Sequence, residues 1–325
     1  MAKIDLEKIP RYSQLPIDKS APEGSSWGVF GDDYELGCLN FLTPEGVVEA
    51  ARLVQKGKVF RLDVKVGYAQ PTLFGRAAVK HTIIRHAGRD GTVMGHDDML
   101  DNYNTQEGSQ WDGLAHIAHA RGFYNGVSAD DIKSGPGSKM SVHRWADKFV
   151  GRGTLVDAFK YRNDQGRPLN PLSASTYTLE DLQGALKAQG TQLKPGGILL
   201  VRTGWMEAYV KSSDEEKQAM APMEDLKACG VETSRALAAW LWDNRVAAIG
   251  TDCPSVEPWP MDFVNGTALH LWALPLLGLP LGEQFELAPL AADCAQDGRY
   301  EFMVVSAPLN VEGGIASPPN AVAIK

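Results

Sequence analysis

Polar side chains that can bind a metal ion are concentrated between residues 105 and 116, in the segment TQEGSQWDGLAH. Gln110 and Asp112 are two positions apart, so they share a face only in extended chain. Gln106 joins them if the chain bends at the glycine between them, and His116 lies one helical turn beyond Asp112. This arrangement would make a metal cradle, although the same residues are also typical of a polar loop without function.

Two neighbouring residues are candidates for substrate contact. Trp111 lies inside the polar segment, where it would either wall a substrate pocket or fill the core. His96 lies in a long polar stretch at 88–109, which we expect to be a loop, and loops of that length are often functional.

Other chemistries find little support in the sequence. We find no G-x-S-x-G, H-E-x-x-H, P-loop or G-x-G-x-x-G motif. Nothing places Cys253 beside His270 as a nucleophilic pair. The four cysteines stand far apart without a C-x-x-C pair, a pattern typical of reduced thiols in the cytoplasm.

Periodicity and capping signals predict mixed helices and strands that must position these side chains. The clearest case is Thr43-Pro44-Glu45, which combines a helix cap, a proline at the first turn and a carboxylate near the positive helix end. Helices are predicted at 44–55, 178–189, 232–243 and 287–295, and strands at 58–66, 196–201, 246–249 and 301–307.

Length and charge restrict the class of protein further. The 325 residues are 44% hydrophobic, with a formal charge of −8, which disfavours nucleic acid as a partner. The most apolar window, 268–281, is too short and too broken by proline to span a membrane, and the first residues do not resemble a signal peptide. We therefore predict one cytoplasmic α/β domain at 27–325, preceded by an extended arm at 1–26.

The polar segment resembles the H-x-G-T-H-x-D-x-x-x-H signature of the putative cyclase superfamily, which includes kynurenine formamidase and isatin hydrolase. Both leading histidines are glutamine here, giving Q-x-x-x-Q-x-D-x-x-x-H, a form similar to the trans-dienelactone hydrolase branch. Further similar segments are WGVFG at 27–31, ELGCLNFLTP at 35–44, ILLVRTGW at 198–205, IGTD at 249–252 with Glu257, and LNVEGGIASPPN at 309–320.

The resemblance implies a fold and a set of site residues. It implies a single mixed-sheet domain of the swivelling β/β/α type. It identifies Asp112, His270 and Glu283 as metal ligands, joined by Gln110 and by Gln106 as a ligand or its support, and His116 as the catalytic proton carrier. Without the resemblance, His270 would be a core histidine and Glu283 a helix-start carboxylate.

The resemblance also implies an activity. We expect one divalent ion, because a second ion would be held poorly without the two imidazoles. The ion would be Mn²⁺ or Zn²⁺, and glutamine oxygens suit manganese better than zinc. Metal-bound water would open a small cyclic ester such as a dienelactone. The alternatives are hydrolysis of a cyclic amide or N-formyl amide, a metal-dependent lyase or cyclase, and a decayed, non-catalytic protein. A small-molecule substrate and a homo-oligomer, dimer or tetramer, complete the expectation.

Overall fold

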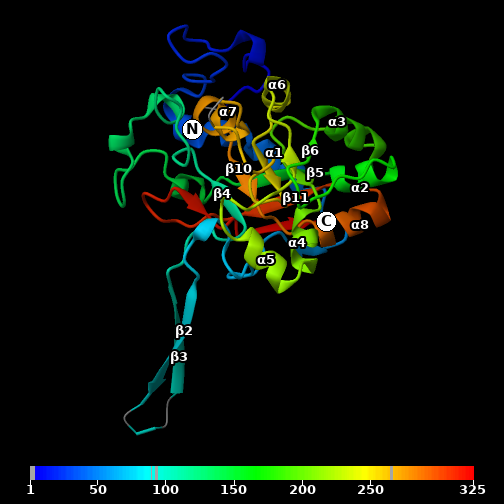
Figure 1. Cartoon of the computed structure of the whole chain (residues 1–325). Coiled ribbons are helices and arrows are strands. Elements are labelled where there is room, and N and C mark those ends of the chain that lie inside the picture. The colour runs from blue at the N-terminus through cyan, green and yellow to red at the C-terminus, as the bar shows by residue number, and fades with distance from the viewer. Residues whose placement is uncertain (1–3, 89, 92–93, 264–265) are drawn as a thin grey trace.

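A mixed β-sheet forms the centre of the molecule in the computed structural model, which describes residues 4–88, 90–91, 94–263 and 266–325 (Figure 1). In the described residues the sheet has nine strands, of which the four central ones, β5, β7, β9 and β10, run parallel. In spatial order the strands are β1 (Val59–Arg61), β13 (Ala321–Ile324), β11 (Glu301–Ser306), β5 (Val150–Asp157), β7 (Ile198–Arg202), β9 (Ala248–Thr251), β10 (Leu281–Glu283), β4 (Gln110–Asp112) and β12 (Ala316–Ser317).

Helices pack around this sheet and bury its apolar side chains. Helix α1 contacts β5 and β11, and α3 contacts β5 and α2. Side chains of Thr43 and Thr178 cap the first turns of α1 and α3, as their sequences predict. The helices are α1 (Pro44–Ala51), α2 (Ala158–Asp164), α3 (Leu179–Ala188), α4 (Trp205–Lys211), α5 (Asp214–Met220), α6 (Arg235–Asp243), α7 (Leu269–Trp272) and α8 (Ala288–Asp297).

The predicted α/β class with a mixed sheet is confirmed. The four predicted helices occur as α1, α3, α6 and α8, and the four predicted strands as β1, β7, β9 and β11, each with shifted ends. A separate pair, β6 (Thr176–Tyr177) and β8 (Gly230–Val231), lies outside the main sheet. No helix within the described ranges is long and apolar enough to cross a membrane.

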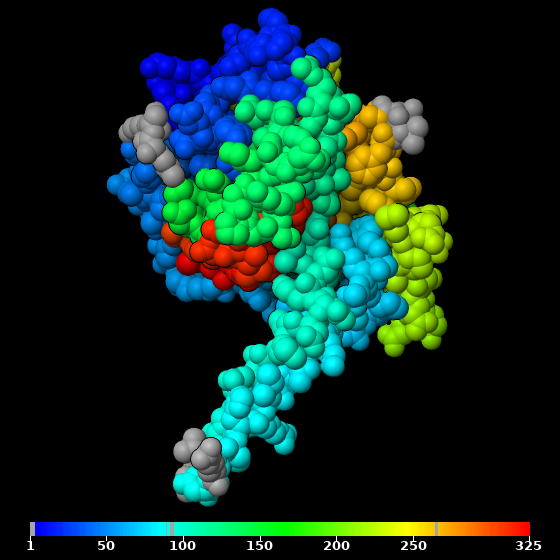
Figure 2. Space-filling view, turned by 90° about the vertical axis from the view of Figure 1, so that its left-hand side faces the viewer, coloured from blue at the N-terminus to red at the C-terminus, as the bar shows by residue number. Residues whose placement is uncertain are grey.

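The stretch at 88–109 is not the continuous loop that its polarity predicted. It contains β3 (Met94–Asp101), which pairs antiparallel with β2 (Lys80–Ala87) to form a two-stranded ribbon. The ribbon projects far from the body of the molecule (Figures 1 and 2). Both of its faces are largely exposed, so β3 has no alternation of apolar and polar residues by which the sequence could reveal a strand.

The N-terminal segment packs against its own chain. Trp242 Nε1 donates to the Pro10 carbonyl (2.9 Å), and Arg245 donates to the Ile9 carbonyl (2.6 Å). The backbone N–H of Tyr12 donates to Asp243 (2.7 Å). These bonds hold the segment on the C-terminal end of α6.

Candidate metal centre

The short strand β4 presents two polar side chains to one side and a tryptophan to the other. Gln110 and Asp112 are buried and share a face, because side chains alternate along a strand. Trp111 is fully buried on the opposite face, where its ring stacks on Phe149 (4.5 Å between centroids) and its Nε1 donates to Ser306 Oγ (3.0 Å). Trp111 therefore packs in the core, which is one of the two roles that its position in the sequence allowed.

Strand β10 brings Glu283 to β4 from far along the chain. The antiparallel register places Glu283 opposite Gln110. Gln110 Nε2 donates to Glu283 Oε2 (2.6 Å) and to Asp112 Oδ1 (3.3 Å). Residues 173 positions apart thus meet because of the pairing of two three-residue strands.

His270, on α7, completes the cluster. Its Nε2 lies 3.3 Å from Glu283 Oε1 and 3.6 Å from Asp112 Oδ2. Its Nδ1 lies 2.8 Å from Glu257 Oε2, and its backbone N–H donates to Glu257 Oε1 (3.0 Å). Glu257 thus orients the ring so that Nε2 faces the other two carboxylates. Sequence reasoning gave Glu257 no role, although it ends the IGTD segment that carries the family resemblance.

Gln106 and His116 lie on the less buried side of the cluster. Gln106 Nε2 donates to Asp112 Oδ1 (2.7 Å) and lies 3.3 Å from His116 Nδ1. The rings of His116 and His270 are 6.1 Å apart between centroids. Potential ligand atoms of Asp112, His116 and His270 all lie within 4.8 Å of one another. The structure therefore gathers all six predicted catalytic and metal-binding residues in one place.

Two unpartnered atoms indicate that this cluster suits a cation. Gln110 Oε1 and Asp112 Oδ2 are buried without a hydrogen-bond partner, which is costly for polar atoms unless another group binds them. Asp112, Glu257 and Glu283 also bury three carboxylates within reach of one histidine. An oxygen-rich, acidic, largely dry site of this kind fits a divalent metal ion.

The electrostatics of the cluster follow from burial. Burial and repulsion by Asp112 raise the pKa of Glu283 to about 8. Burial also lowers the pKa of His116, against the attraction of Asp112. The pKa of Asp112 is lowered despite its burial, because His116 and His270 favour the carboxylate. His116 is therefore suited to act as a neutral base near pH 7.

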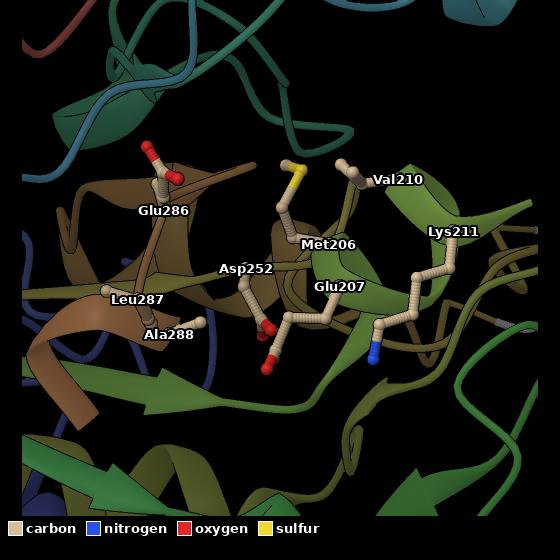
Figure 3. A pocket seen from close by; sticks show the side chains of 8 residues that line it. All are labelled: Met206, Glu207, Val210, Lys211, Asp252, Glu286, Leu287 and Ala288. Atoms are coloured by element: carbon tan, nitrogen blue, oxygen red, sulfur yellow. The ribbon is translucent and has the colours of Figure 1, made fainter. Parts of the chain in front are cut away.

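Two other features lie apart from the cluster. His96 is exposed on the projecting ribbon, in register with Arg85, and is not brought to the cluster within this chain. A cavity of about 170 Å³ beside α4 contains none of the six predicted residues (Figure 3). Burial raises the pKa of its Asp252 to about 6, but both Asp252 oxygens accept bonds from residues 203–204. The cavity is lined by Met206, Glu207, Val210, Lys211, Asp252, Glu286, Leu287 and Ala288.

Comparison with known proteins decides the family. The family model described as putative cyclase matches residues 60–258, which is more than half of the chain. The chain belongs to the putative cyclase family. A solved structure described as a novel cyclase is 32% identical, with a TM-score of 0.82 over 93% of this chain and 97% of that one. A comparison with curated proteins found no match.

Two solved structures of isatin hydrolases share the fold at lower identity. Isatin hydrolase A from Labrenzia aggregata, bound to benzyl benzoate, is 16% identical, with a TM-score of 0.55 over 82% of this chain and 93% of that one. Isatin hydrolase A from Ralstonia solanacearum is 17% identical, with a TM-score of 0.55 over 82% and 92% of the two chains. At these identities the comparison shows only that the folds are similar.

Proposed function

We propose that this cyclase-family protein is a metal-dependent hydrolase that opens a small cyclic ester, a lactone similar to a dienelactone. The observation that carries the proposal is the buried cluster with two unpartnered oxygens, Gln110 Oε1 and Asp112 Oδ2, next to a half-buried histidine, His116. A cation site beside a neutral base suits hydrolysis of an activated carbonyl.

Asp112, His270, Glu283 and Gln110 would hold one divalent ion, Mn²⁺ or Zn²⁺. When bound, the ion supplies Lewis acidity toward a carbonyl oxygen and a water molecule. Replacing two imidazoles by amide oxygens favours manganese over zinc, because the glutamine oxygen is the harder and weaker donor.

The protein's own groups perform the remaining steps. Glu257 fixes the tautomer of His270 by accepting its Nδ1–H, so that Nε2 faces the ion site. His116 takes a proton from the attacking water and returns it to the leaving oxygen of the opened ring. Gln106 holds His116 beside Asp112 through its amide group.

Two alternatives use the same cluster. Hydrolysis of a cyclic amide or an N-formyl amide is the first, because solved structures of isatin hydrolases share the fold. A non-catalytic protein is the second, because two imidazoles of the family signature are replaced. Tightly bound metal in the purified protein distinguishes an enzyme from a decayed relative.

The test is a hydrolysis screen over lactones, cyclic imides and N-formyl amides with added Mn²⁺ or Zn²⁺, in H₂¹⁸O. We expect lactone opening with one labelled oxygen in the product acid. Imide or formamide turnover without lactone turnover would support the first alternative. Turnover without label would identify a lyase or cyclase, and no turnover together with no bound metal would support the second alternative.

We propose that the protein forms a homo-oligomer that uses the β2–β3 ribbon. Apolar side chains are exposed on both faces: Ile83 and Leu100 on one, at 50% and 47%, and Ile84 and Met99 on the other, at 38% and 44%. An isolated two-stranded ribbon is marginally stable in water, so packing on another chain would stabilise it. Basic groups on β2 face acidic groups on β3 within the ribbon itself, as His81 does Asp98 (3.2 Å) and His86 does Asp97 (2.8 Å), so the exposed apolar side chains are the surface that a second copy would cover.

Light scattering of the double variant Ile83→Lys/Leu100→Lys tests this assembly. We expect the molecular mass to fall toward that of one chain. Val48→Lys, at an exposed apolar position outside the ribbon, should leave the mass unchanged.

The four buried free cysteines fit a reducing compartment, and we propose a cytoplasmic location.

A further inference from the structure

Arg76 is a cation beside the metal centre that the proposed mechanism does not use. Its Nη1 donates to the backbone carbonyl of Gln106, whose side chain bonds Asp112. Its electrostatic interactions with Glu283 and Asp112 are the two largest that its surroundings supply. The guanidinium therefore lies next to the cluster.

No carboxylate of the described residues lies within 4.0 Å of this guanidinium, although Arg76 is half-buried. Burial lowers the pKa of Arg76, but an arginine stays charged at neutral pH. A guanidinium has five N–H donors, and the one bond to Gln106 accounts for one of them. Removing a cation from water without a bonded anion is costly, so a partner from outside the chain would stabilise it.

One aromatic ring lies against this cation, and a second ring packs behind it. The Arg76 guanidinium lies 4.9 Å from the centroid of the Phe74 ring. The Phe74 ring in turn packs edge-on against Trp259, at 5.0 Å between centroids. Phe74 has φ 62°, a left-handed conformation that is rare for a bulky residue and is often found at ligand-binding positions. Flat apolar surface beside a fork of N–H donors suits a planar, conjugated ligand with a carboxylate.

We propose that Arg76 binds a carboxylate of the substrate, and that the ligand of this site is therefore a planar, conjugated anion rather than a neutral molecule. The proposal rests on the hydrolase function and specifies its substrate class. The carboxylate would accept two parallel N–H bonds from the guanidinium, while the conjugated part lies against Phe74 and Trp259. The carbonyl that reacts would then face the cluster of Asp112, His270 and Glu283.

A purely structural role for Arg76 makes a different prediction. If Arg76 only holds the Gln106 carbonyl, its loss would disturb the cluster for every ligand alike. If it binds a carboxylate, its loss would weaken anionic ligands and spare neutral ones of the same shape. The comparison of an acid with its ester separates the two roles.

The experiment measures direct binding to the metal-loaded protein, without turnover. The probes are the cis,cis-muconate dianion and its neutral dimethyl ester, followed by equilibrium dialysis. For Arg76→Gln we expect the Kd of muconate to rise at least tenfold, while that of the ester changes less than twofold. Arg121→Gln, which removes an exposed arginine, is the charge-matched control and should leave both values unchanged.

Arg76→Lys adds a second comparison, because lysine keeps the charge but loses the planar fork. We expect its muconate Kd to lie between those of the parent and Arg76→Gln. Equal muconate affinity in the parent and Arg76→Gln overturns the proposal, and so does an equal loss for acid and ester. Because binding is measured without hydrolysis, its result is independent of the lactone screen. If the protein hydrolyses lactones but binds the acid and the ester equally well in the parent and in Arg76→Gln, the proposed function stands and the role of Arg76 is rejected.

Discussion

Glu257 accepts two hydrogen bonds from His270, one from its backbone N–H (3.0 Å) and one from its ring Nδ1–H (2.8 Å). The carboxylate is fully buried and thus fixes the position of the ring as well as its tautomer. Nε2 is left facing Asp112 and Glu283. Glu257 therefore orders the cluster indirectly. It binds His270 on the Nδ1 side of the ring, whereas Asp112 and Glu283 lie on the Nε2 side.

Glu257→Ala should weaken the metal site without removing a ligand. We expect the metal Kd to rise about 10- to 100-fold, the usual effect of losing the group that orients a ligating histidine. Metal titration of the purified variant measures it. Glu286→Gln, which removes a carboxylate paired with Arg61 at the surface, is the control. An unchanged Kd in Glu257→Ala would show that His270 is oriented by other contacts.

Asp112→Asn, His270→Ala and Glu283→Gln should each deplete the bound metal. Each change removes a carboxylate or the imidazole that meets the others in this cluster and would bind the ion. Elemental analysis after purification gives the occupancy, with His143→Ala as a histidine outside the cluster. A variant that retains full occupancy at the parent's affinity would remove its residue from the ligand set.

His116→Ala should strongly lower turnover while leaving the metal in place. A general base or acid contributes about 10²- to 10⁴-fold to the rate, and kcat/KM should fall within that range. Metal content and turnover are measured on the same sample. Because His116 lies within ligand distance of Asp112 and His270, loss of the metal together with activity would make it a ligand instead.

Gln110→His should shift the preference of the site from manganese toward zinc. The Gln110 oxygen is buried and unpartnered, whereas imidazole is a stronger donor for zinc. Competitive binding of both ions to parent and variant gives the selectivity, with the half-buried Gln106→His expected to follow more weakly. Unchanged selectivity at position 110 would mean that this side chain does not touch the ion.

Asp297 provides a test of stability against pH. Burial opposes ionisation of Asp297, but hydrogen bonds from Lys56 and Lys325 outweigh it and hold its pKa below the usual 3.8. Its contribution is therefore fully present above pH 4 and is lost as the pH falls below 3.8. Asp297→Asn should lower the free energy of unfolding by about 1–3 kcal/mol at pH 7. The gap between the unfolding curves should narrow as the pH falls below 3.8 and close only below the lowered pKa of the folded state, and the exposed Asp147→Asn should show no gap at any pH.

The sequence predicts the positions of Gln110 and Asp112 better than those of His270 and Glu283. Two-residue spacing placed Gln110 and Asp112 on one face, and β4 bears this out. His270 and Glu283 lie in apolar surroundings that are equally typical of a core, so their role depended on the family resemblance. The contact itself arises from the pairing of β10 with β4, and register between distant short strands cannot be derived from local pattern.

Residues outside any motif were missed for a different reason. Arg76 lies in an irregular segment after the short 3₁₀ turn Leu73–Gly75, where neither periodicity nor spacing distinguishes it from a surface arginine. The strand β3 was missed because exposure on both faces removes the signal on which strand prediction relies. Contacts with other parts of the chain place both features: the Gln106 carbonyl accepts a bond from Arg76, and β2 pairs with β3.

The ribbon is joined to the candidate metal centre by a short stretch of chain. Strand β3 ends at Asp101, and the same backbone reaches Gln106 five residues later, where the side chain bonds Asp112. A displacement of the ribbon would therefore be passed along a few residues to Gln106, whose side chain lies 3.3 Å from His116 Nδ1. If a second copy packs on the ribbon as proposed, it would position Gln106 and thereby His116, the proposed proton carrier, and we expect specific activity to depend on protein concentration wherever the assembly does.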